Sequence, residues 1–200
     1  MHPSFVSVLC CPETRESLWI EPRETRSNGM VVSGTLTSLS GQRYPIVDGI
    51  PRFVDVEQYA ASFGYEWSRW PRVQFESENA GTAMAGHTTR MWEAITGLGQ
   101  KQLDGKTIVE FGCGPGRFLD VVRRKGGRAV GIDLSLAVRA ASNNFADDPN
   151  VLIVQGNILI PPFREGVFDG GFTIGALHHT PNPLGGLKAL TPTIRSGGWV

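Results

Sequence analysis

The sequence predicts an α/β protein in which a mostly parallel sheet carries helices on both faces and a small β-rich domain precedes it. Residues 105–200 alternate apolar runs such as KTIVEF, RAVGID and NVLIVQ with amphipathic stretches such as GRFLDVVRRKG and SLAVRAASNNFAD. This alternation is typical of a parallel sheet with crossover helices. Residues 1–56 instead carry the strand-like patches MVVSGTLTSL and YPIVDGIPRFV, separated by turn residues. The chain therefore divides near residue 56.

We predict a helical linker or lid for the segment between these blocks, residues 57–104. Tyr59, Phe63, Trp67 and Trp70 recur at a spacing that places them on one face of a helix. Two interpretations of this aromatic stripe stay open. It packs the segment onto the core of the larger domain, or part of it covers a substrate pocket.

Composition and charge narrow the function classes. The 200 residues contain 19 Lys and Arg against 19 Asp and Glu, so the net charge is zero, which argues against a large nucleic-acid surface. No apolar run approaches the roughly 18 residues of a membrane span, and the N-terminus has no signal-peptide pattern. Three cysteines do not make a disulfide framework. We expect a cytoplasmic protein without a membrane partner.

The stretch VEFGCGPGRFLDVV, residues 109–122, joins a strand to a helix through three alternating glycines, Gly112, Gly114 and Gly116. Glycine lets the backbone approach a ligand closely, and the N–H groups of the helix start point outward as donors. Glu110 stands two residues before the first glycine. A pyrophosphate gains nothing from this carboxylate, whereas an amino group does. The pattern therefore favours a nucleoside that bears an amino acid over a dinucleotide.

Asp133 ends the second strand, 19 residues beyond Gly114. Its carboxylate can accept hydrogen bonds from both hydroxyls of a ribose. The alternative role is an N-cap for the helix that starts near Leu136, although Ser135 suits that role better.

The third strand, NVLIVQ, runs into Gly156, Asn157 and Ile158. A polar side chain at this strand end can reach the edge of an adenine, and Ile158 offers it an apolar face. A fourth strand ends near Ile174 and is followed by a loop that contains two histidines.

Five pieces in order, VEFGCGPGRF, GIDLS, QGNILIPPF, FDGGFTIGALHHTPNP and RSGGW, resemble the class I S-adenosylmethionine-dependent methyltransferases of the type-11 kind. The resemblance implies a Rossmann-like sheet, S-adenosylmethionine as the cofactor, and methyl transfer to an oxygen, nitrogen or carbon of a small or medium-sized acceptor. Two alternatives remain. One is an RNA base methyltransferase, and the other is a non-catalytic module that binds the cofactor or a partner.

The resemblance also implies roles. Glu110 holds the methionine amino group, the glycine turn wraps the methionine portion, Asp133 binds the ribose, and the loop from Gly175 lies near the methyl group. Asn157 stands where the family usually has Asp. The cofactor-binding candidates are Glu110, Gly112, Cys113, Gly114, Gly116, Asp133, Leu134, Asn157, Ile158, Gly175 and Leu177.

His178 and His179 are the candidate catalytic residues. A neutral imidazole can take a proton from an acceptor hydroxyl or amine, or it can simply hold the loop in place. Transfer from a sulfonium depends mainly on alignment of donor and acceptor, so a base is not required. We predict no metal at this pair, because adjacent side chains diverge and no third ligand lies near them in the sequence.

The N-terminal block, LCCPETRESL followed by GTLTSLSGQRYPIVDGIPRFV, resembles the zinc ribbon related to the tRNA-methyltransferase activator family. That ribbon has two C-x-x-C pairs, whereas this chain has Cys11 with Thr14, and Thr37 with Ser40. Because hydroxyls are poor zinc ligands, we expect the block to fold without metal and to be stabilised by packing against the larger domain.

Members of the methyltransferase family have a seven-stranded sheet whose last two strands form an antiparallel hairpin. This chain reaches RSGGWV, where the fifth strand is expected to begin. We therefore expect a sheet without the last two strands. The oligomeric state stays open.

Overall fold

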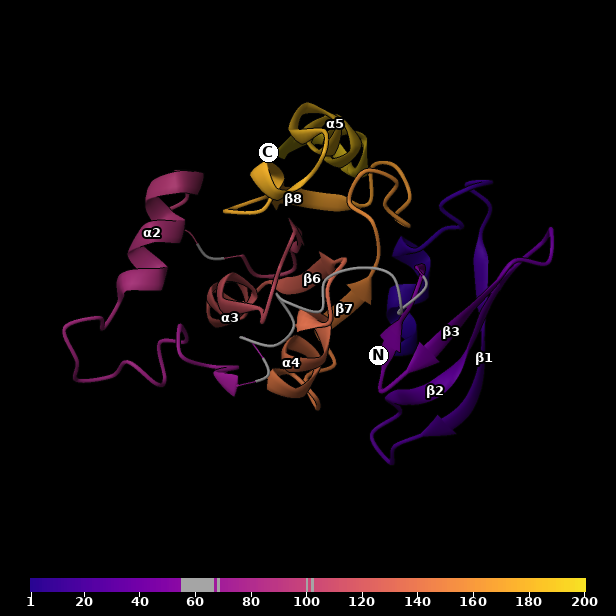
Figure 1. Cartoon of the computed structure of the whole chain (residues 1–200), viewed down its shortest axis with the longest axis horizontal. Helices are drawn as coiled ribbons and strands as arrows, with labels where there is room; N and C mark the ends of the chain where they lie inside the picture. Colours follow the sequence, from indigo (N-terminus) through magenta and orange to yellow (C-terminus); the bar gives the residue numbers. More distant parts are fainter. Residues whose placement is uncertain (55–66, 68, 100, 102) are drawn as a thin grey trace.

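The computed structural model describes residues 1–54, 67, 69–99, 101 and 103–200. Two sheets make up the protein (Figure 1). The N-terminal β-unit, as we call residues 1–54, begins with the 3-10 helix η1 (Pro3–Val8) and continues as a four-stranded antiparallel sheet in the order β1-β2-β3-β4. Its strands are β1 (Leu18–Thr25), β2 (Val31–Ser38), β3 (Arg43–Val47) and β4 (Ile50–Pro51).

The second sheet has five strands in the order β7-β6-β5-β8-β9, and every neighbouring pair is parallel. The strand order reverses between β5 and β8, and ligands of open α/β sheets bind beyond the carboxyl ends of the strands at such a point. The predicted parallel sheet is confirmed, including a fifth strand near the expected position. Its strands are β5 (Thr107–Phe111), β6 (Arg128–Asp133), β7 (Val151–Gln155), β8 (Phe168–Phe172) and β9 (Ile194–Trp199).

The α-helices of the described residues are α2 (His87–Thr96), α3 (Arg117–Arg124), α4 (Ala137–Asn144) and α5 (Pro183–Leu190). The 3-10 turns η2 (Leu177–His179) and η3 (Thr191–Thr193) flank α5. Helix α3 buries one apolar face and stops before Gly126, whose φ of +86° suits a helix end. Within the described part of the chain, no helix is long and apolar enough to cross a membrane.

One face of the parallel sheet is covered by helices. Side chains of α3 and α4, together with Trp92 of α2, pack against Ile108, Ala129 and Ile153 of the sheet. Strand alternation turns Glu110 toward this same face as Ile108. The face therefore combines an apolar interior with a single buried carboxylate near the end of β5.

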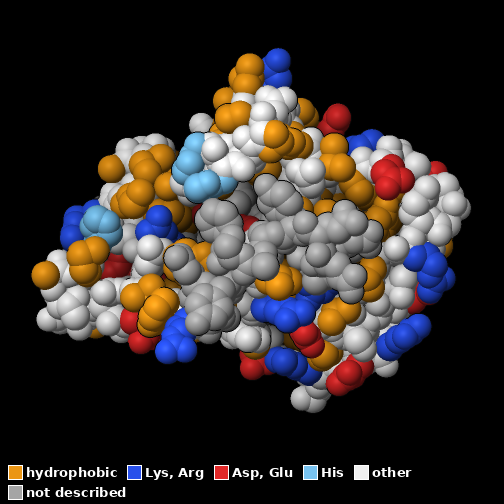
Figure 2. Space-filling view, viewed as in Figure 1, with side chains coloured by type: hydrophobic (Ala, Val, Ile, Leu, Met, Phe, Trp, Pro, Cys, Tyr) orange, Lys and Arg blue, Asp and Glu red, His pale blue; other side chains and the backbone are white. Residues whose placement is uncertain are grey.

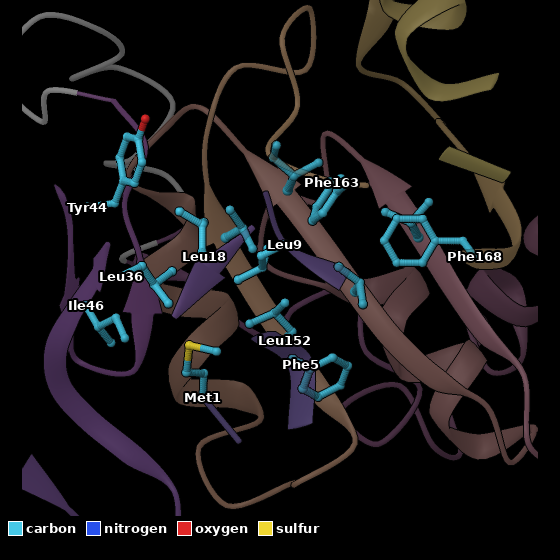
Figure 3. Close-up of a cluster of buried hydrophobic side chains, with 14 of the residues drawn as sticks. Met1, Phe5, Leu9, Leu18, Leu36, Tyr44, Ile46, Leu152, Phe163 and Phe168 are labelled. Atoms are coloured by element: carbon cyan, nitrogen blue, oxygen red, sulfur yellow. The ribbon is translucent and has the colours of Figure 1, made fainter. Parts of the chain in front are cut away.

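The opposite face is shared by α5 and the β-unit. Leu190 of α5 lies in the same buried cluster as Phe5, Leu9 and Leu36 of the β-unit and Leu152 of β7. Figure 3 shows these β-unit side chains pointing toward Leu152 and Phe163. Helices thus occur on both faces of the parallel sheet, as expected. On one of these faces the β-unit packs beside α5. It is stabilised by a core that it shares with the parallel sheet.

The segment at 57–104 is less helical than predicted where it is described. Residues 71–86 form turns and bends, whereas Trp67, Arg69 and the helix α2 are helical as predicted. Gly81 and Gly86 take φ values of +76° and +73°, which interrupt a helix. The exposed fraction of Trp70 is 56%, so Trp70 does not pack onto the core, which was one of the two interpretations of the stripe. Tyr59 and Phe63 lie outside the described residues.

Candidate functional site

The glycine turn lies between the carboxyl end of β5 and the start of α3. The N–H groups of Gly112 and Cys113 donate to the carbonyl of Ile132, over 2.8 and 3.1 Å, which ties the turn to β6. Gly112 has a φ of +79°, and a Cβ there would lie 2.1 Å from Cβ of Ala176. The loops after β5 and β8 therefore approach more closely than any other residue type allows.

Asp133 is fixed on the rim of this turn. Its Oδ2 accepts from the Gly114 N–H over 2.9 Å, and its Oδ1 accepts from the N–H and hydroxyl of Ser135 over 2.8 and 2.7 Å. The Ser135 Oγ in turn accepts from the Ala137 N–H in the first turn of α4. The N-cap of α4 is Leu136, so neither Asp133 nor Ser135 is the N-cap residue, and the half-buried Asp133 contacts the glycine turn.

Glu110 is the electrostatic centre of the site. Its side chain is 1% exposed, and its Oε2 has no hydrogen-bond partner among the described residues. Burial raises the pKa of this carboxyl well above its ordinary value; Arg117 opposes the rise and Asp133 adds to it. A buried acceptor without a donor is costly unless a ligand supplies one. An ammonium group fits this requirement, because it brings both the donor and the opposite charge.

Cys113 contributes its backbone and not its thiol. The side chain is 3% exposed and packs beneath the turn, where a Cβ on Gly131 would come within 2.7 Å of its Sγ. Burial raises the pKa of the thiol well above its ordinary value. The thiol therefore belongs to the core beside α3.

Asn157 and Ile158 follow β7 at the same edge of the sheet. The Asn157 Oδ1 accepts from the Leu159 N–H over 2.9 Å, which closes the loop onto itself. Asn157 is half-buried, and Ile158 is 7% exposed within the core shared with the β-unit. Leu134, after β6, is also half-buried, and its carbonyl accepts from the Gln155 side chain over 3.2 Å.

The loop after β8 carries the remaining candidates. Gly175 is exposed at a φ of +75°, and Leu177 packs against the core shared with the β-unit. His178 and His179 are exposed in η2, and their ring centroids lie 3.9 Å apart. The rings are thus brought together on the surface beside the loop.

Sequence reasoning missed three polar residues at this edge. Gln155 and Arg52 are buried and hydrogen-bonded to each other, and the Thr173 Oγ1, just after β8, is buried without a partner. A polar residue at the end of the apolar run NVLIVQ was a usable signal for Gln155. Arg52 carries no local pattern that separates it from a surface arginine.

A cavity of about 240 Å³ lies elsewhere, between the β-unit and α4, and is lined by residues such as Val31, Ile50 and Ser142. None of the predicted site residues lines it. The candidate site is therefore the edge formed by the strand ends and not this cavity.

The corner of the β-unit that resembles a zinc knuckle is closed by hydrogen bonds. The Cys11 Sγ lies 3.1 Å from the Tyr44 hydroxyl and accepts from the Thr14 N–H. The Glu16 carboxylate accepts from the N–H and hydroxyl of Ser40. In the described residues, no group of three His, Cys, Asp or Glu side chains is suited to hold a metal ion. One thiol with hydroxyls does not fit a tetrahedral zinc site.

Comparison with known proteins finds similarities over the larger domain. A family model described as a methyltransferase domain matches residues 109–200. The ubiquinone biosynthesis O-methyltransferase of Albidiferax ferrireducens is 31% identical over 100 residues, which is 48% of this chain and 40% of that protein. The tRNA U34 carboxymethyltransferase of Pseudoalteromonas translucida is 36% identical over 101 residues, 48% of this chain and 31% of that protein. The chain thus spans less than half the length of these relatives.

Solved structures share the fold. A candidate S-adenosylmethionine-dependent methyltransferase from Methanococcus maripaludis has a TM-score of 0.55 at 16% identity, covering 72% of this chain and 65% of that one. A complex between the Haloferax volcanii Trm112 methyltransferase activator and a candidate methyltransferase also gives 0.55, at 23% identity, covering 71% and 60%. Residues 109–200 therefore match a methyltransferase-domain model, and the solved structures share the fold of this chain.

Proposed function

We propose that this chain transfers a methyl group from S-adenosylmethionine to a small or medium-sized acceptor. The observation that carries the proposal is the buried Glu110 carboxylate, whose Oε2 has no partner beside a glycine turn that admits a ligand. S-adenosylmethionine supplies an activated methyl group on a sulfonium, and its ammonium is the donor that Glu110 lacks.

The remaining cofactor contacts follow from the positions of the side chains. The Gly114 and Gly116 backbone faces the methionine portion, and Cys113 takes part through its backbone. Gly114 and Ser135 together occupy three of the about four acceptor sites of the Asp133 carboxylate. The site that remains on Oδ2 accepts from one ribose hydroxyl. Leu134 and Ile158 enclose the adenine, and Asn157 accepts from its amino group through the second lone pair of Oδ1.

Gly175 and Leu177 lie beside the transferring methyl group in this proposal, and the paired rings of His178 and His179 face the acceptor. Alignment of the two reacting atoms is the main contribution, as for other displacements between bound partners. The histidines orient the acceptor or take its proton. Replacing each by Gln separates the two roles, because Gln hydrogen-bonds but cannot act as a base.

Calorimetric titration with S-adenosylmethionine and with S-adenosylhomocysteine, its demethylated product, tests the proposal. We expect both to bind the folded chain at a single site. A well-folded protein, verified by circular dichroism, that binds neither ligand contradicts the proposal. A protein that binds both but methylates no acceptor in a broad screen supports the non-catalytic alternative.

A second candidate function is methylation of an RNA base, and one observation favours it. One relative acts on tRNA by its name. The zero net charge argues for the small acceptor. On the face shown in Figure 2, outside the grey atoms, basic and acidic side chains are interspersed. Incubation with labelled cofactor and bulk tRNA, against a quinone-precursor phenol, distinguishes the two acceptors.

We further propose that the β-unit is a degenerate zinc ribbon that acts in cis as an activator does in trans. Its support is the contact with the loop after β7. The backbone N–H of Cys10 donates to the Pro162 carbonyl over 2.9 Å. The Arg15 guanidinium donates to the carbonyls of Pro161 and Phe163. The unit therefore braces a loop that leads from the adenine edge of the proposed site.

A further inference from the structure

The last residues of the β-unit reach the edge of the parallel sheet at β7. Arg52 forms a parallel bridge with Gln155, and the Phe53 N–H donates to the Gln155 carbonyl over 2.9 Å. The Arg52 N–H donates to the Pro45 carbonyl of β3 over 2.9 Å, which holds this stretch to its own sheet. One short segment therefore pairs with both sheets.

The side chains of Arg52 and Gln155 form a relay toward the loop after β6. The Arg52 Nη1 donates to Gln155 Oε1, and Gln155 Nε2 donates to the Leu134 carbonyl over 3.2 Å. Arg52 is 4% exposed and Gln155 is 2% exposed. An amide side chain has two donors and one acceptor oxygen. Arg52 thus fixes which end of the Gln155 amide faces Leu134.

The relay is costly for stability alone. The guanidinium is buried against a neutral amide, and its Nη2 has no hydrogen-bond partner among the described residues. Burial lowers its pKa, and the charge of Asp48 only partly opposes this. A buried cation without an ion pair is destabilising, and an apolar residue of similar volume is often the more stable choice. Costs of this kind are typical of residues that position a functional site. Leu134 directly follows Asp133, the proposed ribose ligand.

We propose that Arg52 and Gln155 are positioning residues for the adenosine half of the cofactor, so that the N-terminal β-unit sets the affinity of the methyltransferase domain. The inference rests on the proposed function. The relay holds the Leu134 carbonyl, and thereby the adenine-facing side chain of Leu134 and the carboxylate of Asp133. Neither relay residue touches the reacting atoms.

Gln155→Glu is the decisive variant. A carboxylate keeps and strengthens the contact with Arg52, so the folded protein is not expected to lose stability. It cannot donate to the Leu134 carbonyl and repels it instead. A net hydrogen bond contributes about 1 kcal/mol, so its loss should raise the dissociation constant of the cofactor roughly fivefold to tenfold. We expect that loss, with KM for the cofactor raised and kcat little changed.

The choice of ligands locates the effect. 5′-Methylthioadenosine carries the adenine and ribose without the amino acid. Gln155→Glu should weaken the binding of 5′-methylthioadenosine, S-adenosylmethionine and S-adenosylhomocysteine by similar factors. Glu110→Gln should weaken only the two ligands that bear the amino acid. Equal affinities of Gln155→Glu and wild type for 5′-methylthioadenosine overturn the inference.

Two further variants serve as a check and a control. Arg52→Met removes the buried cation, so thermal stability should hold or rise while adenosine affinity falls. Arg139→Met removes an exposed arginine of α4 whose charge acts on Arg52 but which, among the described residues, makes no hydrogen bond to Gln155 or Leu134. Its affinities should therefore equal those of wild type. If Arg52→Met loses stability and affinity in parallel, while Gln155→Glu retains both, the role of the pair is structural only.

Hydrogen exchange keeps this inference separate from the proposed function. In the ligand-free protein, the amides of residues 134–137 should exchange faster in Gln155→Glu than in wild type. This result does not depend on which ligand the protein binds. A wild type that binds no adenosine ligand refutes the proposed function and, with it, the affinity role of the relay. Unchanged exchange together with unchanged affinity refutes the relay alone.

Discussion

The Asp133 carboxylate at the end of β6 accepts a hydrogen bond from the Gly114 N–H in the turn after β5, over 2.9 Å. These residues are 19 positions apart in the chain, and the contact joins two neighbouring strand ends of the sheet. The same carboxylate also holds Ser135. It therefore organises the loops on both sides before any ligand arrives, which is the preorganisation that tight binding requires.

Asp133→Ala should weaken the binding of S-adenosylmethionine by about 10- to 100-fold, because a hydrogen bond to a charged group contributes roughly 1.5–3 kcal/mol. Titration calorimetry measures this change. Asp147→Ala is the control, since the Asp147 side chain is 75% exposed and pairs with Arg26 of the β-unit. Unchanged affinity in Asp133→Ala rules out its ribose role.

Gly112→Ala should destabilise the protein more than Gly105→Ala. Both glycines have positive φ, +79° and +70°, but a Cβ at Gly105 meets nothing within 4 Å, whereas one at Gly112 collides with Ala176. The strained backbone costs each variant about 1 kcal/mol, and the overpacking adds about 1–3 kcal/mol at Gly112. Urea unfolding measures the difference. Equal losses would mean that the loop after β8 moves aside freely.

Glu110→Gln should stabilise the ligand-free protein increasingly as pH rises above about 4.5. Burial raises the pKa of Glu110 in the folded state above its ordinary value of 4.5. Between these two pKa values the unfolded chain has released the proton and the folded chain has kept it, so the stability of wild type falls as pH rises. Gln has no such proton. Unfolding curves across this range, with the exposed Glu165→Gln as control, should diverge only for Glu110→Gln.

Binding of S-adenosylmethionine should release about one proton from wild type at a pH where Glu110 is protonated. The ligand's ammonium favours the ionised carboxylate, which reverses the effect of burial. Calorimetry in buffers of different ionisation enthalpy counts the protons. Glu110→Gln should release none, and an identical release from both proteins would assign the proton to another group.

A metal chelator should leave the melting temperature of the protein unchanged, and the purified chain should hold no stoichiometric zinc. The reason is that Cys11 is engaged by Tyr44 and Thr14, while Glu16 is engaged by Ser40. Elemental analysis and thermal unfolding with and without chelator check this. Stoichiometric zinc that is removed with a loss of stability contradicts it.

Much of the fold is readable from the sequence, because the parallel strands are continuous apolar runs and the helices between them carry apolar stripes. The turn residues Gly112 and Gly114 are also identifiable from the sequence, because glycines at this spacing after a strand indicate a turn that needs backbone freedom. The helical prediction for residues 57–104 was wrong over residues 71–86. The aromatic spacing behind it ends at Trp70, and Gly81 and Gly86 take positive φ values that a helix excludes.

The contact between Arg52 and Gln155 could not be predicted from local sequence patterns. Arg52 becomes buried only because two sheets meet at β7, and its partner Gln155 lies 103 positions away. Hydrophobic periodicity describes how one element faces a core, whereas this contact depends on the packing of two domains. The placement of the β-unit on the sheet likewise follows from tertiary packing and not from any single motif.

The core shared by Phe5, Leu9 and Leu152 has a consequence for regulation. An activator that binds as a separate subunit can be withdrawn, titrated or shared among several catalytic partners. A unit whose side chains complete the interior of its own enzyme cannot be exchanged in this way. Under the proposed function, the β-unit is therefore supplied at one copy per active site, without competition between enzymes for a common activator.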